Sequence, residues 1–457
     1  MSTNISRRKV VAGAAWAAPV VAASAVVPAF ASSTECEDKK TPAYSIEGTS
    51  AGAKTVQKFK VPANVDKINF VAIGGPGGTQ YSAVPGGASA QISGTIAVKE
   101  GQVVEIVAAA GGVGNFPLDP SEGGEGYGNG GSSKGTDAIP ASVVSKVNAV
   151  WPGNSQLKRR LFSSSGGGSS AVLIDGVPVA VAGGGGGVGV INAGGSNNER
   201  YVYTGAIDAG WWKSDGNRAE YPYMASKAGS ASGLTGGAGE QGYGYYTEDH
   251  AQQIAVEAGK GGAGGIGGTG GTKTALPTGK SPNGVIGFDN TNNQVLFSSS
   301  AAGNQGGSGF NGNGADGTSA YSYQLDNNDK NTPETVYPGG GTTGTPRYMT
   351  YPDVGFNFNG HQAIVSSGGG AGYGGGGSGA ARALSAILVN QKWNGNTAPN
   401  GLRQNISYGI QAGAGGAGGS YLASNVIDGA ITSAKNGATG PGVRNPGSVE
   451  ITFCKRS

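Results

Sequence analysis

The chain has 457 residues, of which 91 are glycine and only 13% are charged, against roughly 7% glycine and about 25% charged residues in average proteins. Beyond residue 31, the 28 basic side chains equal the 28 acidic ones in number. Nucleic acids and anionic membranes bind to basic surfaces, so the absence of net charge argues against both partner classes.

The N-terminus has the pattern of an export signal. Adjacent Arg7 and Arg8 precede a charge-free stretch over residues 10–34, which contains the small residues Ala29 and Ala31. This arrangement predicts cleavage after residue 31, and the paired arginines are typical of a twin-arginine signal. An ordinary Sec signal and a retained membrane anchor are the alternatives. We expect a bacterial protein that is secreted or displayed on the cell surface.

The mature chain, residues 32–457, is expected to form one glycine-rich domain without a further membrane span. Its two cysteines, Cys36 and Cys454, lie near its ends. Disulfides persist in exported proteins, so we predict that these two residues pair. The alternatives are two unrelated thiols or a lipid attached to Cys36.

Short segments with a two-residue periodicity predict antiparallel strands. The clearest covers residues 90–98, where apolar and mostly polar side chains alternate, as in a half-buried strand. Further strands are expected over residues 55–61, 67–73, 102–110 and 449–454. Asp175-Gly176, between residues 171–174 and 177–182, predicts a two-residue hairpin turn.

Helices are not expected outside the signal, because glycine interrupts nearly every apolar window and costs about 1 kcal/mol per helical position. The predicted fold class is therefore all-β. Many short strands separated by glycine-rich turns favour a β-sandwich or jelly roll.

Two long polar segments, at about 192–227 and 272–357, are expected to be surface insertions. Rigid aromatic side chains occur among glycine, serine and asparagine in the first insertion and shortly after it. They are Tyr201, Tyr203, Trp211, Trp212, Tyr221, Tyr223, Tyr243, Tyr245 and Tyr246. This mixture is typical of a recognition surface. The alternative is that these aromatic residues cover the glycine runs.

Five glycine-rich runs each lie next to a strand-like segment, at residues 74–78, 183–189, 261–271, 368–379 and 413–419. Within 261–271, Ala263, Ile266 and Thr269 each follow a Gly-Gly pair. An extended helix with three residues per turn places every third side chain along one edge. The bare edges can then approach one another and exchange backbone hydrogen bonds. We expect a bundle of polyglycine II helices, and the alternatives are disordered linkers or collagen.

Several motifs occur in the order seen in a known family. They are Phe59-Lys60-Val61-Pro62, Ile96-Ala97-Val98-Lys99-Glu100-Gly101-Gln102, Ala180-Val181-Ala182-Gly183-Gly184, Gly418-Gly419-Ser420-Tyr421 and Pro446-Gly447-Ser448-Val449-Glu450-Ile451. With them, the chain resembles bacterial members of the glycine-rich domain family that also occurs in the extracellular parts of anaplastic lymphoma kinase and leukocyte tyrosine kinase. The resemblance implies a TNF-like β-sandwich that carries a hexagonal bundle of polyglycine helices. It implies no signalling role, because no kinase-like segment is present.

Catalysis has little support in the sequence. The chain has two histidines, His250 and His361, which lie far apart in sequence. A histidine-based metal site or catalytic triad is therefore not expected. We expect no catalytic residue, metal or cofactor.

The function expected is that of an exported structural or adhesive protein, which presents recognition loops to a surface glycan or protein. The alternatives are a secreted carbohydrate-binding module that uses the aromatic loops as stacking platforms, and an exported hydrolase.

Overall fold

The computed structural model describes residues 34–36, 42–79, 85–114, 120–135, 145, 157–192, 206–208, 223–245, 253–273, 279–281, 284–286, 294–326, 360–383, 386–389, 392–393, 396–397, 403–406, 410–437 and 442–456. The predicted export signal, with Arg7, Arg8, Ala29 and Ala31, lies outside these ranges. Every regular element assigned within them is a β-strand. The all-β prediction is confirmed.

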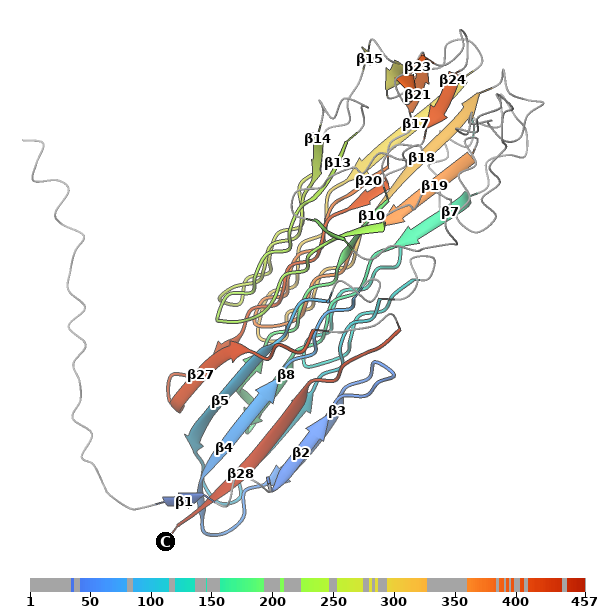
Figure 1. Cartoon of the computed structure of the whole chain (residues 1–457). Helices are drawn as coiled ribbons and strands as arrows, with labels where there is room; N and C mark the ends of the chain where they lie inside the picture. Colours follow the sequence, from blue (N-terminus) through green and yellow to red (C-terminus); the bar gives the residue numbers. More distant parts are fainter. Residues whose placement is uncertain are drawn as a thin grey trace, which may run out of the picture.

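Two antiparallel sheets form a sandwich at one end of the molecule (Figure 1). The first has the order β1-β28-β4-β5-β27, and β2 also pairs with β28. Its strands are β1 (Thr34–Cys36), β2 (Tyr44–Glu47), β4 (Val65–Ile73), β5 (Ala90–Ala97), β27 (Ile427–Ser433) and β28 (Ser448–Arg456). The second has the order β26-β9-β8-β6-β3. Its strands are β3 (Thr55–Lys60), β6 (Val103–Ala108), β8 (Ser170–Ile174), β9 (Val177–Ala182) and β26 (Tyr421–Leu422).

The two sheets share one apolar core because their strands alternate as the sequence predicts. In β5, Ala90, Ile92 and Ile96 are buried and the residues between them are at least partly exposed. They pack in one cluster with Phe70 from β4 and Ile106 from the second sheet. Each fully buried aliphatic or aromatic side chain of this size contributes about 1.5–3 kcal/mol. The strands predicted over 55–61, 67–73, 90–98, 102–110 and 449–454 are confirmed to within three residues at their ends.

The predicted hairpin is also confirmed. Strands β8 and β9 pair on either side of Asp175 and Gly176, whose φ angles are 50° and 80°. Positive φ at both central residues is the requirement of the two-residue turn that matches strand twist.

A nine-stranded sheet lies at the other end of the molecule (Figure 1). Its order is β11-β12-β10-β25-β20-β17-β18-β19-β7. The strands are β7 (Leu157–Phe162), β10 (Gly189–Asn192), β11 (Ala206–Asp208), β12 (Tyr223–Ser226), β17 (Gln294–Ala301), β18 (Ser319–Asp326), β19 (Gly360–Val365), β20 (Ala381–Ala383) and β25 (Ile410–Ala412). A smaller core that includes Leu161, Val190 and Ile364 packs on it. The described parts of both predicted insertions thus contribute strands.

Smaller sheets accompany it at this end (Figure 1). One pairs β13 (Gly242–Tyr245) with β14 (Gln253–Val256), and another pairs β22 (Lys392–Trp393) with β23 (Asn396–Thr397). The third joins β15 (Gly279–Ser281), β16 (Gly284–Ile286), β21 (Ala386–Val389) and β24 (Arg403–Ile406).

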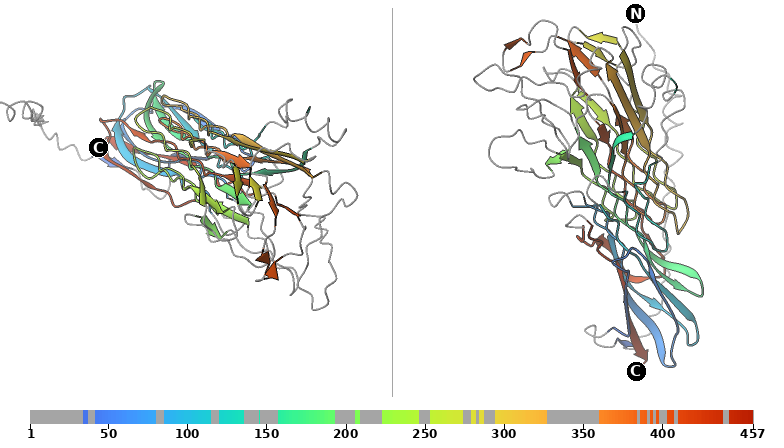
Figure 2. Two further views of the ribbon diagram at one scale, coloured as in Figure 1. Left: turned by 90° about the horizontal axis from the view of Figure 1, so that it is seen from above. Right: turned by 90° about the vertical axis from the view of Figure 1, so that its right-hand side faces the viewer.

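Glycine-rich segments fill the middle of the elongated molecule, between the sandwich and the nine-stranded sheet (Figures 1 and 2). Residues 163–169 lead from β7 to β8, residues 183–188 from β9 to β10, and residues 413–420 from β25 to β26. Residues 302–318 and 366–380 instead leave the nine-stranded sheet, turn and return to it. Both ends of each crossing segment are therefore anchored in a sheet.

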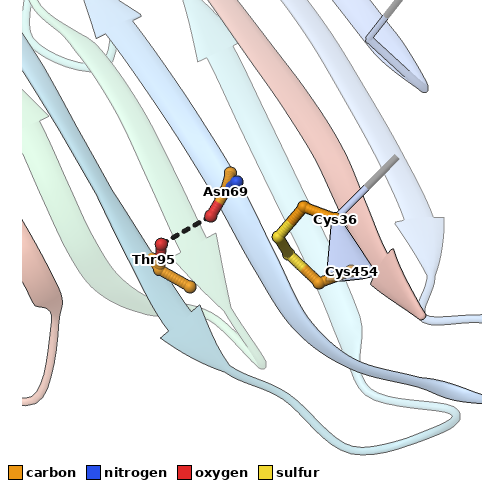
Figure 3. Close-up of a disulfide and its surroundings, with 4 residues drawn as sticks. All are labelled: Cys36, Asn69, Thr95 and Cys454. Carbon is orange, nitrogen blue, oxygen red and sulfur yellow. Dashed lines mark hydrogen bonds between the residues drawn. A yellow bond between two sulfur atoms is a disulfide. The ribbon is translucent and has the colours of Figure 1, made fainter. Parts of the chain in front are cut away.

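A disulfide joins Cys36 and Cys454 (Figure 3), which confirms the predicted pairing. The two cysteines lie opposite each other in the β1–β28 ladder, although 418 positions separate them in sequence. We call this end of the molecule the proximal pole and the end with the nine-stranded sheet the distal pole. Both ends of the described chain lie at the proximal pole.

Changing both Cys36 and Cys454 to serine should lower the free energy of unfolding. A loop of this length gives an upper value of roughly 5 kcal/mol in the chain-entropy model. Urea unfolding of the oxidised protein and of the double variant measures the difference. Identical urea midpoints would show that the bridge does not restrict the unfolded chain.

Candidate functional site

Backbone hydrogen bonds join the glycine-rich segments side by side, and their pattern repeats every three residues. Residues 163–169 illustrate it. The amides of Ser164 and Gly167 donate to the carbonyls of Val188 and Gly185 in one neighbouring segment. Those of Ser165 and Gly168 donate to Val113 and Ala110 in a second, and those of Gly166 and Ser169 donate to Gly131 and Gly128 in a third. All six N-to-O distances are 2.9–3.0 Å. Each amide therefore donates to the same neighbouring segment as the amide three positions away.

The carbonyl groups of this segment follow the same rule toward three other segments. Ser164 and Gly167 accept from Gly368 and Ala371, Ser165 and Gly168 from Gly78 and Gly75, and Gly166 and Ser169 from Gly124 and Tyr127, at 2.7–3.1 Å. Six segments thus surround residues 163–169. Because every amide and carbonyl of residues 164–169 has a partner, none of these buried backbone groups carries the cost of an unmade hydrogen bond.

The spacing between segments explains why glycine is required. A Cβ atom built on Gly183 would lie 2.5 Å from the carbonyl oxygen of Gly418, which is closer than real side chains approach. Serine occurs where its hydroxyl group can form hydrogen bonds with backbone groups of neighbouring segments. The Ser165 Oγ accepts from the Val113 amide at 2.9 Å and donates to the Glu122 carbonyl at 2.6 Å.

The predicted aromatic binding surface is described only in part. Tyr223 lies on β12, and Tyr243 and Tyr245 lie on β13. Strand β12 pairs with β10, and β13 contacts β10 and β25. These three tyrosine positions therefore lie on strands that gather around β10 at the distal pole. Outside the described residues are Tyr201, Tyr203, Trp211, Trp212, Tyr221 and Tyr246.

A second aromatic group, which the sequence analysis missed, lies where glycine-rich segments turn beside the sandwich. The rings of Phe310 and Tyr373 stack with centroids 4.8 Å apart. Tyr421 contacts them edge-on at 4.9 and 5.1 Å. Leu234 and Ile266 occupy neighbouring turns and are 61% and 67% exposed. We call these five residues the aromatic ledge.

A signal for the ledge exists in the sequence. Ile266 and Tyr373 are single large side chains with glycine on both sides. A large side chain at a turn between glycine-rich segments points away from the bundle, because the interior of the bundle has no room for it.

Among the described residues, three ionisable groups have shifted pKa values. Burial, reinforced by the nearby Glu105 carboxylate, raises the pKa of Tyr127. Hydrogen bonds from the Thr272 hydroxyl and amide lower the pKa of Glu257. Burial lowers the pKa of Arg444, whose guanidinium donates to the carbonyls of Gly111 and Glu122 at 2.7 and 2.9 Å.

Within the described ranges, no three His, Cys, Asp or Glu side chains are close enough to hold a metal ion. His361 lies on β19, whereas His250 falls outside these ranges. The same part of the chain contains no helix that is both long and apolar enough to cross a membrane.

No family model matches this sequence, and no curated protein matches it. The resemblance to the glycine-rich domain family therefore stays a prediction.

Gly184→Ala should destabilise the bundle by about 1–3 kcal/mol, the usual range for overpacking a tight interior. The added methyl group would overlap the Gly167 carbonyl oxygen. Gly233→Ala is the matched control, because no atom lies within 4 Å of its built Cβ. Chemical unfolding of both variants measures the difference. Equal stabilities would contradict a close-packed bundle.

Proposed function

We propose that this protein is an exported, non-catalytic structural or adhesive protein of the bacterial surface. In this proposal the glycine-rich segments form a rigid platform that holds recognition loops away from the point of attachment. The partner is a surface glycan or protein. Nucleic acid is not expected, because the mature chain has no net charge.

We further propose that the glycine-rich segments are polyglycine II helices. The supporting observation is the three-residue repeat of lateral hydrogen bonds along residues 163–169, because a helix with three residues per turn returns to the same neighbour at every third position. The same repeat occurs along residues 413–419, where Gly413, Gly416 and Gly419 donate to Ala380, Gly377 and Gly374.

For the sandwich we propose the jelly-roll connectivity of TNF-like domains. Neighbouring strands that are distant in sequence support it. Strand β28 lies beside β4, and β3 lies beside β6. The chain also passes from one sheet to the other between β2 and β3, between β3 and β4, and between β5 and β6.

The observation that carries the functional proposal is the separation of the two poles (Figure 1). The disulfide and both ends of the described chain lie at the proximal pole, and the strands of the predicted insertions lie at the distal pole. An attachment near either end would direct the distal pole outward. Strands β12 and β13, which carry Tyr223, Tyr243 and Tyr245, are at that pole.

A secreted carbohydrate-binding module is the second candidate. The gathering of the tyrosine-bearing strands β12 and β13 around β10 favours it, since aromatic rings are the usual stacking platforms for sugars.

Export is tested by changing Arg7 and Arg8 to lysine. The unchanged protein should appear in the envelope or the medium, and the double variant should accumulate in the cytoplasm, because twin-arginine signals require both arginines. Fractionation followed by immunoblotting makes the measurement. Equal export of both forms would indicate a Sec signal, and cytoplasmic retention of the unchanged protein would contradict the proposal.

Recognition by the predicted aromatic surface is tested by changing Trp211 and Trp212 to alanine. Beads coated with the purified mature protein should adhere to cells, and the double variant should lose this adhesion with an unchanged thermal unfolding midpoint. Trp393→Ala, outside the predicted surface, is the control. A lower midpoint for the double variant, with adhesion lost only in proportion to unfolding, would assign the tryptophans a covering role instead.

A further inference from the structure

The aromatic ledge continues an apolar row that crosses the outer face of the five-stranded sheet. Val56, Val107, Ala171, Val181 and Tyr421 lie opposite one another on β3, β6, β8, β9 and β26. The middle three are buried, and Tyr421 packs against their cluster. Tyr421 therefore rests on a fixed apolar support.

The other ledge residues are held in place through Tyr421 and through the backbone of the turns. Its ring contacts both Phe310 and Tyr373. The amide before it, that of Ser420, donates to the Leu234 carbonyl at 3.1 Å, and the Gly265 amide, next to Ile266, donates to the Tyr373 carbonyl at 3.4 Å. A surface that is ordered before binding loses little conformational entropy when a partner arrives.

The ledge is also exposed and free of charge. Phe310, Ile266 and Leu234 are 37%, 67% and 61% exposed. Their turns are neighbours, because the Gly309 amide donates to the Gly265 carbonyl and Thr235 bridges to Ala263. Exposed apolar side chains that gather on one surface mark interaction sites. The turns that form it, residues 232–235, 263–266, 308–311 and 371–374, contain no Asp, Glu, Lys or Arg, and neither do residues 419–422, which include strand β26. A charged partner would lose hydration here without gaining an ion pair.

Two charged side chains on the same sheet face are paired with each other. Lys58 and Glu105 occupy the next outward positions after Val56 and Val107, and their side chains form an ion pair at 2.9 Å. The partner that fits the ledge is therefore neutral, presents an apolar face to the rings, and carries hydroxyl groups for exposed polar neighbours such as Ser308 and Asn311.

We propose that the aromatic ledge binds a neutral oligosaccharide. The apolar C–H face of a sugar ring stacks on Phe310 and packs against Ile266 and Leu234, and its hydroxyl groups reach the polar rim. This site is separate from the distal loops of the proposed function, because the ledge lies on turns beside the sandwich. It gives the protein a lateral binding surface in addition to the distal one.

Isothermal titration calorimetry of the purified mature protein tests the proposal. The probes are cellohexaose and chitohexaose, both neutral, and hexagalacturonate, which is charged. We expect one of the neutral probes to bind and hexagalacturonate not to bind. Phe310→Ala should weaken this binding at least tenfold. Val177→Ala is the matched control, since Val177 is an apolar side chain with 65% exposure at the start of β9, outside the ledge.

Hydroxyl-radical footprinting of the unchanged protein gives a readout that needs no variant. Phe310 and Tyr373 should become protected when the bound probe is present. Failure of both neutral probes to bind, equal binding of hexagalacturonate, or loss of binding only in the Trp211→Ala/Trp212→Ala variant would each overturn the proposal. So would Phe310-dependent self-association in sedimentation velocity, which would assign the ledge to a second copy of the chain.

Discussion

The structure depends on the lateral hydrogen bond between backbones that carry no side chain. Ordering one glycine costs on the order of 1–2 kcal/mol of backbone entropy, and one hydrogen bond returns about 0.5–1.5 kcal/mol net. A single segment therefore cannot hold its shape alone. Residues 163–169 do so because six segments surround them and because β7 and β8 fix both of their ends.

The close spacing of the backbones also determines where the molecule can expose large side chains. The interior of the bundle has no room for large side chains, as the approach of Gly183 to Gly418 illustrates, and serine and alanine are the side chains that it holds most often. Large residues are consequently confined to the sheets at the two poles and to the turns between segments. This restriction explains the position of the ledge around Phe310. It also explains why Tyr223 and Tyr243 belong to strands and not to the bundle. In the proposed function, recognition would occur at these defined sites on a support that has few degrees of freedom.

Patterns of neighbouring residues in the sequence were sufficient to predict strands of the sandwich. They were insufficient to predict which segments form the bundle. Residue types and their spacing were enough to predict three features of the sandwich. These are the strand at residues 90–98, the Asp175-Gly176 turn and the disulfide between the two cysteines. The Gly-Gly-X spacing of residues 261–271 predicted one extended segment with Ala263, Ile266 and Thr269 along one edge, and this is wrong, because the chain reverses between Ala263 and Ile266. The spacing does not show where a segment turns or which neighbours it adopts, since these depend on contacts between similar backbones that are distant in sequence. Residues 163–169, rich in serine, and 302–318, within a predicted insertion, therefore went unrecognised as parts of the bundle. The short distal strands show too few alternations to be recognised.

Amide hydrogen exchange resolved at residues 163–169 and 413–420 tests the account most directly. The lateral bonds predict that these amides exchange as slowly as those of strand β4 in the sandwich core, even though the segments belong to no sheet. Exchange at the rate of an unstructured peptide, with β4 still protected, would show that the segments are loose connections between two independent sheets and would contradict the rigid platform.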